Sequence, residues 1–132
     1  MRLFVDSGAH LALMIRDDQH HASAVALLES LTDARLVTSR FVLAEVLNRA
    51  VRQVSARIAT TYVRGVLDRP SYSVLPALEG VFDRSMDLLT RYEEHGLSFI
   101  DCTSLVSMRD GRIRTLFTFD RAFRKLGFEV VP

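Results

Sequence analysis

The chain has 132 residues, of which 48% are hydrophobic and 25% charged, and its formal net charge at pH 7 is +1. This length predicts a single domain over residues 1–132 with one packed core. No apolar run approaches the roughly 20 residues of a membrane span, and the N-terminus does not resemble a signal peptide. Cys102 is the only cysteine, which excludes an intrachain disulfide and favours a cytoplasmic location.

Short apolar segments alternate with stretches of helical period along the whole chain. Strands are predicted at residues 3–5, 35–37, 72–75, 115–118 and 128–131. Helices are predicted at residues 7–16, 20–31, about 40–54, 57–66, 78–94, 101–109 and 120–126. Ser7 and Ser39 are the candidate N-caps of the first and third helices. Such alternation predicts an α/β fold in which helices cover both faces of a parallel sheet.

Four acidic residues stand within or next to apolar segments: Asp6, Glu45, Asp101 and Asp120. A carboxylate beside a buried segment is costly unless something satisfies its charge. Ligands of parallel α/β sheets bind beyond the carboxyl ends of the strands, and Asp6 and Asp120 follow predicted strands. Glu45 and Asp101, which the pattern places early in helices, can reach the same end. The sequence therefore predicts one anionic pocket formed by all four.

The missing partner of such a pocket is a cation. Two carboxylates about 5 Å apart repel each other by roughly 3 kcal/mol at an effective dielectric constant of about 20. Oxygen-only ligands favour Mg²⁺ or Mn²⁺. The spacing alone leaves a second interpretation open, in which the acids are unrelated. Glu45 would then pair with Arg49 one helical turn on, and Asp120 would cap the helix that it precedes.

Basic residues are concentrated in two parts of the chain. Residues 35–69 hold seven arginines against two acids, a net charge of +5, and residues 102–132 have a net charge of +3. Sixteen of the seventeen basic residues are arginine, which binds phosphate in a bidentate manner. These blocks are compatible with contacts to a phosphate backbone, although a genome that prefers arginine codons explains the composition equally well.

Four stretches, in their order and spacing, resemble the motifs of PIN domains, and more narrowly those of VapC-type toxins from bacterial toxin–antitoxin pairs. They are LFVDS at 3–7, VTSRFVLAEV at 37–46, FIDCTSL at 99–105 and LFTFDRAF at 116–123. The chain departs from the family at Cys102, where members commonly carry alanine. It also departs at the Asp110-Gly111 turn, which lies among Arg109, Arg112 and Arg114 and is predicted to serve substrate binding or packing.

The resemblance implies a three-layer PIN-like fold with a central, mostly parallel five-stranded sheet. It implies a toxin that hydrolyses RNA phosphodiester bonds with metal-activated water, using Mg²⁺ or Mn²⁺. Metal-binding and catalytic roles fall on Asp6, Glu45, Asp101 and Asp120. Three hydroxyl residues are expected to support these acids or to contact phosphate: Ser7, Thr38 and Thr118. The implied partners are an RNA substrate, a small VapB-like antitoxin and a second copy of the chain in a homodimer, with no membrane.

Two other functions compete with this interpretation. A Mg²⁺-dependent phosphatase or phosphotransfer domain also uses an aspartate at a sheet end, but Asp6 is followed by Ser7 and Gly8 rather than by a second nearby acid. A receiver domain would need a lysine at a late strand end, whereas Lys125 lies inside a predicted helix. A catalytically silent PIN fold that binds RNA or protein would be expected to have lost acids, and all four are present.

Overall fold

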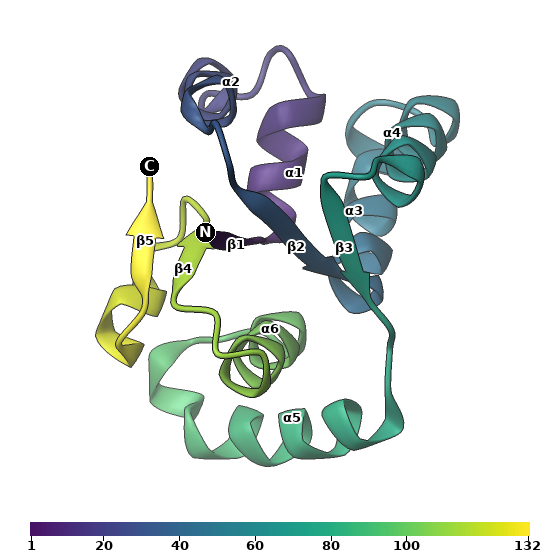
Figure 1. Ribbon diagram of the computed structural model, residues 1–132. Coiled ribbons are helices and arrows are strands. Elements are labelled where there is room, and N and C mark those ends of the chain that lie inside the picture. The colour runs from purple at the N-terminus through teal and green to yellow at the C-terminus, as the bar shows by residue number, and fades with distance from the viewer.

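The computed structural model describes residues 1–132 and contains one sheet of five strands (Figure 1). The strands are β1 (Arg2–Val5), β2 (Arg35–Ser39), β3 (Tyr72–Leu75), β4 (Thr115–Phe117) and β5 (Glu129–Val131). Their order in the sheet is β3-β2-β1-β4-β5, and every neighbouring pair is parallel. The predicted five-stranded α/β sheet is confirmed, and it is entirely parallel.

Six α-helices and two 3₁₀ helices connect the strands. They are α1 (Ser7–Met14), α2 (His21–Ser30), α3 (Arg40–Gln53), α4 (Ala56–Asp68), α5 (Glu79–Arg91), η1 (Glu93–His95), α6 (Phe99–Asp110) and η2 (Arg121–Leu126). Right-handed crossovers between parallel strands place α1 to α4 on one face, and α5 and α6 on the other, because the chain reverses direction across the sheet after β3. Figure 1 shows α6 next to α5, and the two helices pack against each other. None of the helices combines the length and the apolar character that a membrane span requires.

The centre of the sheet is apolar on both sides, as expected for a strand that helices cover on both faces. Leu3, Phe4 and Val5 of β1 are completely buried, and Leu116 and Phe117 of β4 lie beside them in the same core. Continuous apolar residues of this kind are what the sequence pattern detects. The strand that precedes the first acid is therefore packed on both faces.

Several predicted helix ends differ from the structure. Asp6, not Ser7, is the N-cap of α1, because Asp6 has the extended backbone that a cap needs and its carboxylate accepts the Ala9 N–H. The helix predicted over residues 78–94 ends at Arg91, and Gly96, at a φ of 67°, ends η1 instead. The segment after Asp120 is a 3₁₀ helix rather than an α-helix.

His10 of α1 is a buried polar residue that the sequence did not single out. It is completely buried, with Nδ1 2.8 Å from the Tyr62 hydroxyl and Nε2 3.1 Å from the hydroxyl of Thr38. Burial lowers its pKa to about 3, so the ring is neutral at pH 7. The three side chains tie α1 to β2 and α4.

We expect Tyr62→Phe to destabilise the protein, because it leaves Nδ1 of His10 without its hydrogen-bond partner in the core. The free energy of unfolding should fall by about 1–3 kcal/mol, measured by urea denaturation at pH 7. Tyr92→Phe is the matched control, since its hydroxyl meets only an exposed arginine. Equal stability of the two variants would show that the His10 contacts contribute nothing.

Candidate active site

Asp6 stands at the carboxyl end of the central strand, where β1 gives way to α1. Its backbone N–H donates to the Phe117 carbonyl at 3.2 Å, which continues the pairing of β1 with β4. One carboxylate oxygen, Oδ1, accepts the Ala9 N–H at 3.0 Å, and Oδ2 accepts the Thr118 hydroxyl. The side chain is only 8% exposed. The orientation of the Asp6 carboxylate is therefore fixed by the first turn of α1 and by Thr118, which follows β4.

Glu45 reaches the same place from α3. The Ser7 hydroxyl donates a hydrogen bond to Oε2 of Glu45, which joins the first turn of α1 to the second turn of α3. Glu45 makes no ion pair with Arg49; the one ion pair in the structure joins Arg84 to Asp110. The interpretation of Glu45 as a simple helix-surface partner of Arg49 is therefore wrong.

Asp101 and Asp120 each sit at the beginning of a helix. Asp101 forms a capping box with Ser98: its N–H donates to the serine hydroxyl, and its Oδ2 accepts the serine N–H, both at 3.0 Å. Asp120 caps η2 by accepting the Ala122 N–H at 2.9 Å. Its own N–H donates to the Thr118 hydroxyl at 3.0 Å. Thr118 consequently links Asp120 to Asp6.

The structure brings all four acids together around one pocket of about 250 Å³. The lining residues are Asp6, Ser7, Gly8, Glu45, Arg49, Ser98, Asp101, Thr118, Phe119 and Asp120. Seven of these ten come from strand ends or first helical turns, where the sequence pattern placed its candidates. Parallel strands that end at one sheet edge produce this convergence.

The predicted hydroxyl residues do not all reach the pocket. Ser7 and Thr118 line it and hold Glu45 and Asp6. Thr38 does not: it is completely buried, donates to the Val5 carbonyl at 3.0 Å and contacts His10. Because Thr38 lies inside strand β2 rather than at its end, its side chain points into the core beneath α1.

Four residues that line the pocket were not predicted as site residues from the sequence: Gly8, Arg49, Ser98 and Phe119. Arg49, which the sequence suggested only as an ion-pair partner of Glu45, is the only basic residue that lines the pocket. Phe119 stacks on His20, with ring centroids 4.2 Å apart and planes 5° from parallel. The sequence pattern gives no signal for the contact between Phe119 and His20, because these residues are 99 positions apart in the chain.

Burial, with a further contribution from neighbouring carboxylates, raises the pKa values of Asp6 and Asp101. Burial raises the pKa of Asp6 to about 7, the hydrogen bonds from Thr118 and Ala9 oppose this shift, and the charges of Asp101 and Asp120 add to it. The pKa of Asp101 is also raised, chiefly by burial and further by the charges of Asp120 and Glu45. The four groups therefore share one electrostatic environment, in which a full set of negative charges is unfavourable.

The donor set fits a hard divalent cation. Glu45, Asp101 and Asp120 each use one carboxylate oxygen in a hydrogen bond with the protein and keep the other free. All available ligands are oxygens, which suits Mg²⁺ or Mn²⁺. No three of the acids lie at the spacing of a metal cluster in this structure.

Comparison with known proteins identifies the fold. The model of the PIN domain matches residues 3–129. The chain belongs to the PIN-domain family. It is 32% identical to the 23S rRNA-specific endonuclease VapC20 of Mycobacterium tuberculosis over 134 aligned positions, which cover 98% of each protein. This confirms the resemblance drawn from the four motifs and rules against a receiver or phosphotransfer domain.

Solved structures agree with this assignment. The crystal structure of M. tuberculosis VapC20, described as a sarcin–ricin-loop-cleaving toxin, matches with a TM-score of 0.90 and 28% identity over 98% of this chain and 99% of that one. VapBC2 from Rickettsia felis, bound to a promoter DNA fragment, matches with a TM-score of 0.72 at 17% identity, covering 98% and 97% of the two chains. The second match shows the fold alone. The PIN-domain match and the similarity to VapC20 place this chain among VapC-type ribonucleases.

The buried charge of Asp6 should lower stability above neutral pH in the absence of metal. Its pKa is about 7 in the folded protein against 3.8 ordinarily, so the stability that its protonation provides is complete below pH 4 and is lost as pH rises through 7. We expect Asp6→Asn to raise the free energy of unfolding at pH 8 by up to about 4 kcal/mol, since one pKa unit corresponds to about 1.4 kcal/mol.

The measurement is thermal unfolding of both proteins in EDTA between pH 5 and pH 8. The advantage of Asp6→Asn should shrink as pH falls, whereas the exposed control Asp33→Asn should track the wild type throughout. A wild type that is the more stable protein at pH 8 would contradict the assignment of Asp6 as an unfavourable buried charge.

Proposed function

We propose that this protein is a metal-dependent endoribonuclease, the toxin of a toxin–antitoxin pair, and that it cleaves 23S ribosomal RNA. The observation that carries the proposal is the convergence of four carboxylates from three helix starts and α3 on one pocket of a PIN domain. Such a set of oxygen ligands, with no nucleophilic side chain among them, suits hydrolysis by an activated water.

Asp6, Glu45, Asp101 and Asp120 would hold Mg²⁺, with Mn²⁺ as the alternative. When bound, the cation lowers the pKa of water and neutralises charge that develops on the phosphate. Backbone N–H groups at helix starts orient the carboxylates of Asp6, Asp101 and Asp120. Burial of Asp6 keeps competing solvent away from it and strengthens its attraction for a cation.

The remaining pocket residues orient the acids and the substrate. Ser7 fixes the carboxylate of Glu45, and Thr118 fixes that of Asp6 while it accepts the Asp120 N–H. Thr38 acts one step further away, since it holds His10 and the Val5 carbonyl next to Asp6. Arg49, the one cation on the wall, is placed to neutralise a non-bridging oxygen of the bound phosphate.

The substrate proposal rests on VapC20, which is described as specific for 23S rRNA and as cleaving the sarcin–ricin loop. The identity of 32% extends over 98% of both chains. A single-stranded loop with unstacked bases is also what an open pocket beside an aromatic pair, Phe119 and His20, can accept. The same proposal places the protein in the cytoplasm, with the ribosomes.

A groove near the end of α1, at Leu13, is a candidate docking site for an antitoxin. The groove, of about 390 Å³, is formed by α1, α2, α4 and β3 and is mostly apolar; it is lined by Leu13, Val25, Leu28, Thr61, Tyr62, Gly65, Val66, Arg69 and Tyr72. We propose that apolar residues of a VapB-like tail occupy it and that a basic side chain of the tail reaches the acids. The positive charge of that side chain would then take the place of the metal ion's charge beside the four carboxylates.

Homodimerisation would use the outer face of α5. Leu78, Phe82, Met86 and Leu89 are exposed and recur at the spacing of one helical face. Exposed apolar residues gathered in one stripe favour burial against a partner. A twofold dimer buries the same stripe from both copies.

We expect purified protein to cut RNA that contains the sarcin–ricin loop in Mg²⁺ or Mn²⁺ and to stop in excess EDTA. Asp101→Asn and Asp6→Asn should each reduce the rate by at least about a hundredfold, as for other lost charge stabilisers. Asp33→Asn is the control and should cleave normally. Transfer RNA and messenger RNA serve as competing substrates in the same assay.

Undiminished cleavage in EDTA would exclude the metal mechanism, and cutting of transfer RNA in preference to the loop would exclude the substrate proposal. Tight RNA binding without cleavage under any metal condition would favour a catalytically silent module.

A small protein encoded next to this chain should inhibit the nuclease, and its basic tail residues should be required for full inhibition. The measurement compares the wild-type antitoxin with a variant in which every basic tail residue is alanine, at increasing Mg²⁺. Competition with Mg²⁺ should disappear in the variant. If inhibition is unchanged, steric cover of the pocket is sufficient and the charge replacement is wrong.

A further inference from the structure

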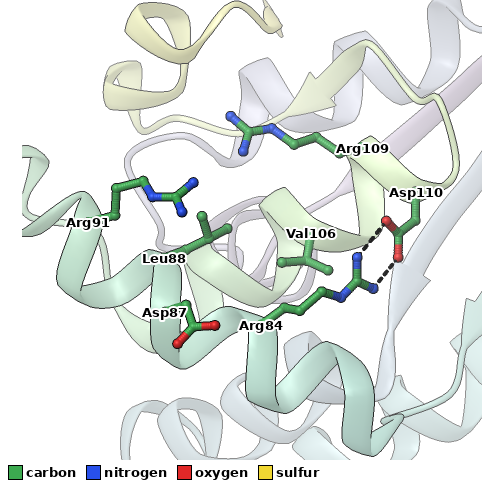
Figure 2. A pocket seen from close by; sticks show the side chains of 7 residues that line it. All are labelled: Arg84, Asp87, Leu88, Arg91, Val106, Arg109 and Asp110. Carbon is green, nitrogen blue, oxygen red and sulfur yellow. Dashed lines mark hydrogen bonds and ion pairs between the residues drawn. The ribbon is translucent and has the colours of Figure 1, made fainter.

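A second hollow, of about 260 Å³, lies between α5 and α6, outside the acid pocket. It is lined by Arg84, Asp87, Leu88, Arg91, Val106, Arg109 and Asp110. Figure 2 shows that the guanidinium groups of Arg91, from α5, and Arg109, from α6, extend toward the same open space. Leu88 and Val106 form its apolar floor. We call this hollow the arginine cleft.

The charges in the arginine cleft are only partly balanced. Arg84 is fully engaged by Asp110, with two hydrogen bonds between the guanidinium and the carboxylate, one of them 2.9 Å long (Figure 2). That is the single ion pair in the structure. Arg91 and Arg109 therefore have no carboxylate within 4.0 Å, although Asp87 lies on the same wall. Two unpaired guanidinium groups facing one cavity favour an anionic ligand.

Arg109 is already held in place. Its Nη2 donates to the Tyr92 hydroxyl at 3.2 Å, and its guanidinium carbon lies 5.8 Å from the centroid of the Tyr92 ring. These contacts already restrict the rotamers of the Arg109 side chain. Less side-chain entropy is therefore lost when Arg109 binds a ligand. The Asp110-Gly111 turn is used for packing, since Asp110 binds Arg84 and the Gly111 carbonyl accepts a hydrogen bond from Arg2. Arg109 is left available for a ligand.

We propose that Arg91 and Arg109 form a phosphate-binding subsite for the RNA substrate, away from the acid pocket; this rests on the proposed function. The acid pocket has four carboxylates and one arginine, so a polyanion needs cationic contacts elsewhere. The planar guanidinium fork matches the two free oxygens of a phosphodiester. The cleft volume equals that of about nine water molecules at roughly 30 Å³ each, which is enough for a hydrated phosphate.

The position of the subsite sets the length of RNA that can use it. Asp101 and Arg109 are eight residues apart on α6, which corresponds to about 12 Å along the helix axis. A phosphate in the arginine cleft therefore belongs to a nucleotide at least about two positions from the one that is cut. Structured RNA can contact both sites, whereas a very short oligonucleotide cannot.

The test is RNA affinity measured by fluorescence anisotropy, in EDTA to prevent cleavage, with a labelled sarcin–ricin-loop hairpin and with a trinucleotide. Arg91→Ala and Arg109→Ala should each weaken hairpin binding about threefold to tenfold and reduce the salt dependence by roughly one phosphate contact. Arg91→Lys and Arg109→Lys should retain most of the affinity. Asp87→Asn should strengthen binding, because it removes the one uncompensated negative charge in the cleft. Trinucleotide binding should be unchanged in every variant.

Arg64→Ala, an exposed arginine of α4, is the matched control, and circular dichroism melts confirm that each variant folds. If the wild type binds and cleaves the hairpin but the Arg91→Ala/Arg109→Ala double variant binds it equally well, the subsite is wrong and the proposed function stands. Loss of antitoxin affinity in that double variant, with RNA binding intact, would assign the cleft to an acidic protein segment and overturn the proposal.

Two further results are decisive. Saturation of the cleft by inorganic phosphate or adenosine monophosphate, with hairpin affinity unaffected, would make it a site for free phosphate and overturn the proposal. A wild type that neither binds nor cleaves any RNA would overturn both the subsite and the proposed function.

Discussion

The parallel pairing of β1 with β4 brings together two segments that are more than a hundred residues apart in the chain. Both strands end at the same side of the sheet. Val5 lies beside Phe117 in this pairing, and the residues that follow them, Asp6 and Thr118, are joined by a hydrogen bond. Thr118 in turn accepts the Asp120 N–H. A slip of one residue in this register would separate Asp6 from Thr118. The hydrophobic core and the acid pocket therefore depend on the same pairing.

The acids also serve the fold. Asp6, Asp101 and Asp120 each accept a backbone N–H at the beginning of a helix, where the helix dipole favours a negative charge. Capping and ligand binding were alternatives when only the sequence was considered. In the structure they are compatible, because a carboxylate has two oxygens and the cap of Asp101 or Asp120 occupies only one. Capping offsets part of the repulsion among the acids and fixes the directions of the three capping carboxylates.

Much of this arrangement could be predicted from the sequence, because it depends on local patterns. The apolar run Leu3–Val5 predicts a buried strand, and the acid that follows it must then lie at the sheet edge. Contacts between distant residues could not be predicted in this way. The pairing of His10 with Tyr62 and Thr38 gives no periodic signal, and neither does the ion pair between Arg84 and Asp110. Thr38 was misplaced for a related reason: the pattern ended its strand at Val37, whereas β2 continues to Ser39.

Cation binding is the most direct test, because four converging carboxylates need a cation to balance their charges. Titration of Mn²⁺, followed by the loss of the electron paramagnetic resonance signal of the free ion, measures binding without any RNA. The wild type should take up Mn²⁺, and Asp101→Asn and Glu45→Gln should each bind it much more weakly, while the exposed control Asp33→Asn should match the wild type. Equal uptake by Asp101→Asn, Glu45→Gln and the wild type would contradict the assignment of these acids as a cation site.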